Sequence, residues 1–434
     1  MNRTFRSFHT ADSQQAKLKM LNWANRFNIC CFLDSHQYPS SGNSIEVVAA
    51  AGVLHEIRCN AGNAFNQLFD FHSSHRDWIF GHLAYDLKNE TENLQSVHSD
   101  LIGFPDLYFF IPRIIVFIRG DEVVIGMEEN EHEKVFLEIM QEDITWMDKR
   151  SFGESIHFTS RFSHEEYIQT IRELQNHILK GDCYEINLCQ EFFAEGVQID
   201  PVQVFHALCQ VSPNPFASFY RLNGLYCLCA SPERYLKKEG ERIFSQPIKG
   251  TVARAGKRSD AEGRLALRSS TKDRSENVMI VDLVRNDLSK VCREGSVRVE
   301  ELFGIYTFPQ VHQMISTVSG ILREGIPWVE AIRASFPMGS MTGAPKLRVM
   351  QLIEKYERSR RGLFSGSIGY IDPSGDFDFN VVIRSIFYNQ ECQALSFLAG
   401  SAITYYSVPE LEYQECLLKV RAIKKVLTDE ISTL

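Results

Sequence analysis

Hydrophobic residues in the first 150 positions of the chain occur in short runs that are separated by turn-forming residues. Runs of this length that are rich in β-branched and aromatic residues are typical of strands. The tripeptide Arg119-Gly120-Asp121 between the last two runs is a hairpin signal. We therefore predict an antiparallel sheet with strands over residues 29–33, 44–51, 78–84, 107–118 and 122–127.

A helical pattern begins at Ser163, which forms a capping-box pattern with Glu166. Apolar residues then recur three or four positions apart as far as Ile178, and Gly181 supplies a C-terminal stop. The residues after this helix alternate in the way that predicts a strand. One face of that strand comprises residues 184, 186, 188 and 190.

Strands and helices then follow one another in blocks. We predict strands over residues 225–230 and 243–248, and helices over residues 272–288, 345–356 and 409–427. This order, with its many hairpins, favours an α+β fold over a doubly wound parallel sheet. Two parts of the chain are expected: an N-terminal subdomain over residues 1–150 and a larger domain over residues 155–430, with the seam near Gly153.

The composition is that of a soluble globular protein, with 434 residues, 44% of them hydrophobic and 23% charged. A formal net charge of −9 argues against a nucleic-acid or anionic-membrane partner. We expect no signal peptide and no membrane span. The 11 cysteines form no CxxC pairs, which favours reduced thiols in a cytoplasm and argues against zinc.

Two predicted helices carry pairs of acidic residues three positions apart. Asp273 and Glu276 share a face of the first helix, and Glu412 and Glu415 share a face of the last. Paired carboxylates of this kind suit a hard cation such as Mg2+. The alternative is a solvated helix surface. Apolar residues that follow Glu276 and Glu415 favour burial, and buried acids need a partner or a metal.

Lys249 ends a predicted strand beside Gly250. It could act as a nucleophile or as an anion contact, although most lysines simply lie on the surface. Burial and a nearby cation would lower its pKa, whereas Glu233 would raise it. The segment 339–346, which includes Thr342, leads into a helix, and its free amides could bind an anion or form a structural turn.

Three further polar residues interrupt apolar surroundings. Arg384 lies within an apolar strand, where its charge requires a carboxylate or phosphate. Glu233 follows an apolar strand, which is a setting for a protonated carboxyl that acts as an acid. His312 is isolated, and a structural role is its default interpretation.

These motifs, in this order, resemble those of the chorismate-utilising enzymes: anthranilate, aminodeoxychorismate, isochorismate and salicylate synthases. The matching segments lie within residues 163–427 and comprise residues 231–234, 247–251, 272–276 with 281–287, 341–346, 366–370 and 412–415. The resemblance implies large antiparallel sheets packed as a sandwich with helices outside. It also implies that residues 155–430 form a chorismate-binding catalytic domain.

The resemblance also implies roles for individual residues. Glu276 and Glu415 would bind Mg2+ directly, with Asp273 and Glu412 acting through water, and Glu233 would protonate the departing C4 hydroxyl of chorismate. Residues that would hold the substrate are Gly250, Thr251, Thr342, Tyr370, Arg384, Gly400, Ser401 and Lys419. Residues 400–402 depart from the Gly-Ala-Gly that is frequent in the family, which puts Ala402 in doubt.

Two positions indicate the branch of the family. A lysine at position 249 is similar to that of aminodeoxychorismate synthase component I, where it would attack C2 of chorismate before ammonia attacks C4. Gln190 is expected to take the place of the lysine base of water-using members. The alternative is anthranilate synthase component I, in which a histidine matched by His312 is tied to pyruvate elimination.

The chain has no room for a glutaminase domain beside these motifs. The resemblance therefore implies a separate glutamine amidotransferase subunit as the source of ammonia, with chorismate as the other substrate. Residues 32–35 and 212–216 fall where relatives build a tryptophan pocket, so tryptophan is a possible additional ligand.

Overall fold

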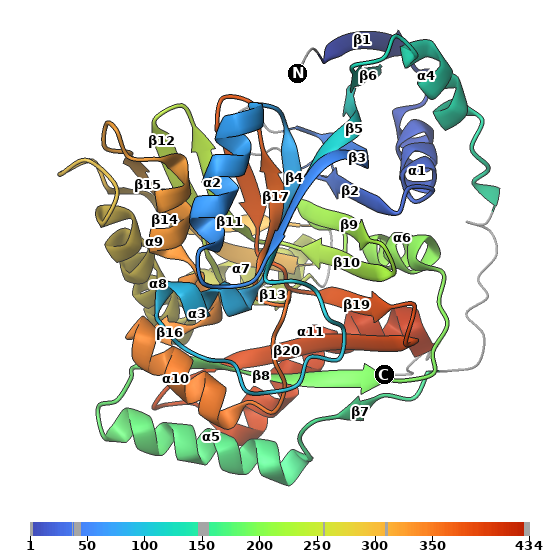
Figure 1. The fold of residues 1–434 in the computed structure, drawn as a ribbon. Helices are drawn as coiled ribbons and strands as arrows, with labels where there is room; N and C mark the ends of the chain where they lie inside the picture. The colour runs from blue at the N-terminus through green and yellow to red at the C-terminus, as the bar shows by residue number, and fades with distance from the viewer. Residues whose placement is uncertain are drawn as a thin grey trace.

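The computed structural model describes residues 3–36, 38, 45–145, 156–254, 257–308 and 311–428. Its strands belong to one hydrogen-bonded network of antiparallel pairs that is covered by helices (Figure 1). The predicted α+β fold with large antiparallel sheets is confirmed. None of the helices in the described ranges combines the length and apolarity that a membrane span needs.

The N-terminal strands form the antiparallel arrangement that their hydrophobic runs predict. β2 (Ile29–Asp34) pairs with β3 (Val47–Cys59), and β3 pairs with β5 (Leu107–Arg119). β5 also pairs with β4 (Ile79–Leu83) and, through the predicted hairpin, with β6 (Glu122–Met127). The observed β3 extends beyond the predicted end at residue 51. The prediction stopped there because the residues that follow are partly buried or exposed and are less uniformly apolar.

The sheet continues across the two halves of the chain. β2 pairs with β9 (Phe216–Leu222), and β4 pairs with β17 (Ser367–Ile371). Both hydrophobic cores contain residues from before and after position 150. The predicted seam near Gly153 lies outside the described residues, and the division into two domains stays a prediction.

After position 150, one layer contains β8 (Glu185–Ala194), β20 (Ala394–Ile403), β19 (Ser385–Asn389) and β10 (Leu225–Ser231). Helices α5 (His164–Leu179), α6 (Pro201–Val211) and α11 (Pro409–Thr428) lie along this layer (Figure 1). The predicted capping box between Ser163 and Glu166 is present.

The other layer contains β11 (Arg234–Glu239), β12 (Arg242–Gln246), β13 (Ile248–Ala253), β14 (Arg298–Thr307), β15 (Val311–Ile321) and β18 (Phe377–Asn380). Helices α7 (Lys257–Ser269) and α8 (Thr271–Ser289) pack on β13 and β15. The sequence predicted α8 but not α7, which consists largely of polar residues.

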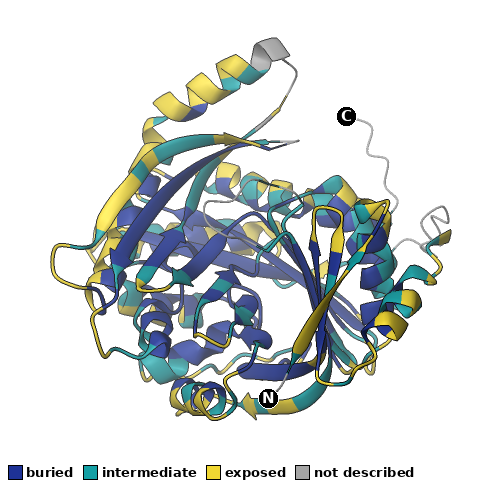
Figure 2. Ribbon diagram, turned by 90° about the horizontal axis from the view of Figure 1, so that it is seen from above, coloured by how far each residue is buried: buried dark blue, intermediate teal, exposed yellow. Residues whose placement is uncertain are grey.

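Short elements complete the fold: β1 (Thr4–His9), α1 (Ser13–Ala24), α2 (Ala64–His75), η1 (Tyr85–Leu87), α3 (Lys88–Thr91), α4 (His132–Met140), β7 (Thr159–Ser160), α9 (Trp328–Ser335), η3 (Gly339–Met341), β16 (Gly343–Ala344) and α10 (Lys346–Tyr356). Buried strands fill the interior, and exposed residues lie on the outward faces of the peripheral helices (Figure 2). All 11 cysteines are free, as the absence of a disulfide pattern predicted.

Candidate active site

The two acidic helix faces meet, although they arise from distant parts of the sequence. The ammonium of Lys272 on α8 lies 3.1 Å from Glu412 Oε1 and 3.8 Å from Glu415 Oε2 on α11, and 3.9 Å from Glu276 Oε1 on its own helix. The side chains of Glu276 and Glu412 are 10% and 2% exposed, and that of Glu415 is 39% exposed. The spacing of the acids therefore predicted a real cluster.

The two helices that carry this cluster are less buried than the sequence indicated. Val278 on α8 and Leu418 on α11 are exposed, so these two helices are not buried all round. Each helix instead turns one face inward, and Glu276 and Glu412 lie on those faces. The apolar residues beside the acids indicated burial, but the periodicity of the helix decides which of them are buried.

The buried carboxylates of this cluster are incompletely satisfied. Glu276 Oε1 and Glu412 Oε2 are buried and accept no hydrogen bond. Burial raises the pKa of Glu276 to about 7, although Lys249 and Lys272 oppose the shift. In the described ranges no three His, Cys, Asp or Glu side chains form a ready metal-ligand set. The unsatisfied oxygens lie beside the half-exposed Lys272 ammonium, so the negative charge of the cluster is only partly compensated.

Lys249 projects from β13 into the same region. Its Nζ donates a hydrogen bond of 2.8 Å to Glu185 Oε1, and the two side chains are 11% and 2% exposed. Burial would lower the pKa of Lys249, but the carboxylates of Glu185, Glu276 and Glu233 outweigh burial and raise this pKa. The sequence suggested both effects on the pKa of Lys249, and the effect of the carboxylates is the larger one. Lys249 is therefore an ammonium at neutral pH.

Glu233 lies between β10 and β11 and is buried. Burial raises its pKa to about 7, while a hydrogen bond with Ser340 and the charge of Lys249 act in the opposite direction. A carboxyl group with this pKa is partly protonated at neutral pH and can donate a proton. This environment matches the acid role that the sequence suggested for Glu233.

Gly250 allows the backbone to approach α8 closely. Its φ is +86°, and a Cβ at this position would lie 2.8 Å from Leu267 Cδ1 and 2.9 Å from Asp273 Oδ1. Asp273 therefore faces Gly250 on β13. The neighbouring Thr251 is exposed and pairs with Gln313 of β15.

Two cations that the sequence suggested as substrate contacts differ in their partners. Lys419 Nζ donates to Gly400 O at 2.9 Å and forms an ion pair with Glu415 at 2.8 Å. The guanidinium of Arg384 has no hydrogen-bond or ion-pair partner among the described residues, and burial lowers its pKa. Arg384 is only partly buried, and a guanidinium without a carboxylate is suited to bind an anionic ligand.

Gln190 and Ser401 do not join Lys249. Gln190 donates to Cys416 Sγ at 3.6 Å, on the face of β8 opposite to Glu185. Ser401 pairs with Leu188 and lies on the same face as Gln190. The predicted face of the strand, residues 184–190 in steps of two, is correct, but that face packs on α5 and α11.

Thr342 and His312 make local contacts. The Thr342 hydroxyl donates to the backbone oxygens of Met338 and Gly339. His312 lies 3.0 Å from Thr307 Oγ1 through Nδ1 and 3.5 Å from Asp260 Oδ1 through Nε2. Both residues therefore have structural partners, and the anion contact inferred for Thr342 would use backbone groups.

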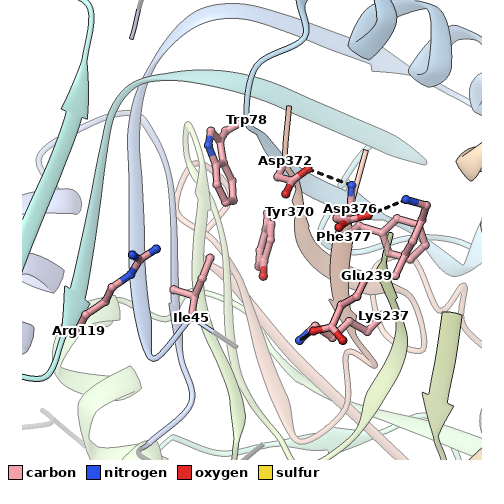
Figure 3. Close-up of a pocket in the computed structure, with 10 residues that line it drawn as sticks. Ile45, Trp78, Arg119, Lys237, Glu239, Tyr370, Asp372, Asp376 and Phe377 are labelled. Carbon is pink, nitrogen blue, oxygen red and sulfur yellow. Dashed lines mark hydrogen bonds and ion pairs between the residues drawn. The ribbon is translucent and has the colours of Figure 1, made fainter. Parts of the chain in front are cut away.

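Tyr370 lines a cavity of about 520 Å3 (Figure 3). Its ring packs against Trp78 with 5.4 Å between centroids. The cavity is lined by Ile45, Trp78, Arg119, Lys237, Lys238, Glu239, Tyr370, Asp372, Asp376 and Phe377. The structure thus places Tyr370 apart from Lys249 and the acidic helices.

The segments 32–35 and 212–216 are adjacent through the pairing of β2 with β9 and a contact of 2.9 Å between His36 Nδ1 and Asn214 O.

Sequence reasoning missed three residues of the site: Glu185, Lys272 and Ser340. Glu185 was the most accessible to prediction, because it is a charged residue at the start of an apolar strand. Its side chain lies on the face of the strand opposite to the apolar face, and the apolar face is the one that includes Gln190. Lys272 and Ser340 lie within segments that the sequence did single out, 272–276 and 339–346, but no role was assigned to these two side chains.

The fold defines the class of protein. The structure of anthranilate synthase component I from Streptococcus pneumoniae superposes with a TM-score of 0.77 over 89% of this chain and 94% of that chain, at 24% sequence identity. Residues 30–425 match the family described as chorismate binding enzyme. The chain belongs to the chorismate-binding enzyme family, as its motifs predicted.

Curated relatives give a finer comparison. The chain is 33% identical to aminodeoxychorismate synthase component 1 of Bacillus subtilis over 80% of this chain and 76% of that protein. It is 36% identical to the chloroplastic aminodeoxychorismate synthase of Arabidopsis thaliana over 79% of this chain. The match spans only 39% of the plant protein's length.

Proposed function

We propose that this chain is an aminodeoxychorismate synthase component 1. It converts chorismate and ammonia into 4-amino-4-deoxychorismate, the precursor of p-aminobenzoate in folate synthesis, in the cytoplasm. The observation that carries the proposal is Lys249, a buried lysine that points among the carboxylates of Glu185, Glu233 and Glu276. The names of the Bacillus and Arabidopsis relatives support the same activity.

The substrate carries two carboxylates, and the site offers cations to receive them. Arg384 has no partner among the described residues, and Lys419 lies beside Gly400. Gly250 brings the backbone so close to Leu267 and Asp273 that a side chain at this position would displace them. These groups would orient chorismate so that its ring lies between Lys249 and Glu233.

Mg2+ is the proposed cofactor. Glu276 and Glu415 would bind it directly, and Asp273 and Glu412 would act through water, because the cluster contains unsatisfied carboxylate oxygens on two helices. When bound, the ion would neutralise a substrate carboxylate and stabilise the charge that develops as the C4 hydroxyl leaves. The carboxylates fit this role because oxygens of Glu276, Glu412 and Glu415 already converge on one cation, the half-exposed Lys272 ammonium.

Two residues would act directly on the reacting atoms, Glu233 as an acid and Lys249 as a nucleophile. Glu233, with its pKa near 7, donates a proton to the C4 hydroxyl, which leaves as water. Lys249 adds to C2 as that bond breaks, and ammonia then adds to C4 and expels the lysine. Anthranilate synthesis is the alternative. His312 does not favour it, because this residue contacts Thr307 and Asp260.

Product analysis tests the proposal. The purified chain is incubated with chorismate, Mg2+ and an ammonium salt, and products are separated by chromatography. We expect a product that retains the enolpyruvyl group, and turnover that rises with the concentration of free ammonia. Glutamine should support turnover only after a glutamine amidotransferase subunit is added. Release of pyruvate with formation of anthranilate would contradict the proposal.

A further inference from the structure

Glu185 is the residue in closest polar contact with Lys249. Its Oε1 accepts the 2.8 Å hydrogen bond, whereas its Oε2 is buried and has no hydrogen-bond partner. The backbone of Glu185 is held by pairing between β8 and β16, where it lies opposite Ala344. A fixed carboxylate with one unused oxygen can accept a proton without rearrangement of its neighbours.

Other acids face Lys249 but have competing roles or lie farther away. Glu233, from the β10–β11 connection, must hold its own proton to act on the leaving hydroxyl. Glu276 on α8 is a proposed metal ligand, and Glu415 on α11 is paired with Lys419. The charges of all these acids interact with that of Lys249, but among the described residues Glu185 is the acid that accepts a hydrogen bond from it.

We infer that Glu185 is a positioning residue that holds Lys249 against the substrate and takes its proton when the amine attacks, an inference that rests on the proposed function. The proton moves from Nζ to the carboxylate, and the neutral amine then forms the N–C2 bond while the C4–O bond breaks. The lysine leaves again as a neutral amine when ammonia adds to C4. Glu185 returns the stored proton, and the pair is restored.

This role predicts a distinct pH dependence. In the parental protein the proton stays within the pair of Lys249 and Glu185. At any pH between the two pKa values of this pair, the fraction of neutral Lys249 therefore does not depend on the solution pH. In Glu185→Gln the amide still accepts the hydrogen bond, but the proton must leave to solvent. The rate of adduct formation should then rise about tenfold per pH unit below the pKa of Lys249.

The first test measures the Lys249 adduct after chorismate is added without ammonia, by quenched mass spectrometry between pH 6 and 8. The protonation of Glu233 affects the rate of adduct formation equally in both proteins, so it cancels when the two rates are divided. We expect the ratio of parental to Glu185→Gln rate to fall about tenfold per pH unit. Glu185→Asp, which keeps the charge, should retain the parental pH profile at a lower rate. A ratio that does not change with pH would overturn the inference.

The second test needs no substrate. Acetic anhydride acylates neutral amines, so labelling of Lys249 across pH reports its protonation. We expect the labelling midpoint of Glu185→Gln to lie about 1–3 pH units below that of the parental protein, because an opposite charge at contact distance is removed. Glu191→Gln is the matched control: Glu191 is also buried on β8, but it pairs with Arg161. Identical profiles for the parental protein and Glu185→Gln would overturn the inference.

The two tests separate the inference from the proposed function. A parental protein that forms neither the adduct nor aminodeoxychorismate would refute the function, and the labelling titration would then decide on Glu185 alone. A shifted labelling midpoint with a flat rate ratio would show that Glu185 is only a counter-ion, which also overturns the inference.

Discussion

Two buried charge clusters in this protein differ in how completely their polar groups are satisfied. Arg361 uses all five of its N–H groups, on Glu357, the backbone oxygens of Met341 and Asn187, and Ser365. In the cluster around Lys249, by contrast, one oxygen each of Glu185, Glu276 and Glu412 has no hydrogen bond.

The difference separates a structural cluster from a functional one. Burying a charge is unfavourable unless hydrogen bonds or an opposite charge compensate for it. The Arg361 cluster is complete within the fold, so its contribution is to stability. The Lys249 cluster is incomplete, so its energy depends on what binds there. Substitutions in the Arg361 cluster should therefore affect stability alone, whereas substitutions in the Lys249 cluster should also affect turnover.

The largest effect is expected from Glu276→Ala, which should abolish turnover because a direct ligand of the proposed metal is lost. The fold should remain, and stability above pH 7 should not fall. The pKa of Glu276 is raised on folding, so its ionisation disfavours the folded state as pH rises from its ordinary value through about 7. Turnover and urea unfolding at pH 8 check both expectations.

Asp273→Ala is the control for this prediction. A ligand that acts through water contributes less, so a loss of activity that is clearly smaller is expected. Parental activity of Glu276→Ala at saturating Mg2+ would refute the assignment of the metal site.

Lys249→Ala should reduce amination by orders of magnitude, since the covalent step is lost. The substitution also leaves the carboxylate of Glu185 buried without its partner, so the unfolding free energy should fall as well. The measurement is the rate of aminodeoxychorismate formation, together with thermal unfolding. If the variant forms product at the parental rate, Lys249 is only an anion contact.

Arg361→Ala should destabilise the fold by about 3–5 kcal/mol, because the carboxylate of Glu357 is left buried without its partner. Urea unfolding at neutral pH measures this loss. Arg285→Ala removes a half-exposed ion pair with Asp282 and should change stability by less than about 1 kcal/mol. Equal effects of the two substitutions would remove the distinction between a completed cluster and a surface pair.

The smallest predicted effect is a pH dependence. The pKa of Glu233 is about 7, so the fraction of its protonated form falls as pH rises above that value. At a fixed concentration of free ammonia, kcat/KM should decline by about tenfold per pH unit above pH 7. Glu233→Gln should be slow and lack this limb. A decline that persists in Glu233→Gln would assign it to another group.

The sequence by itself determined the local features of this protein. It specified the capping box at Ser163, the hairpin at Gly120, and the acidic faces of α8 and α11, because caps, turns and helical spacing depend on neighbouring residues. The order of its motifs was also sufficient to identify the family.

Tertiary structure alone decided which faces meet. Strand periodicity divides β8 into two faces, but only the contact of Glu185 with Lys249 of β13 shows that the face of Glu185, and not that of Gln190, reaches the site. The pKa of Lys249 follows the same rule, since it depends on acids from β8, α8 and the β10–β11 connection. These residues are far apart in sequence, and the electrostatic interactions among them exist only once the chain has folded.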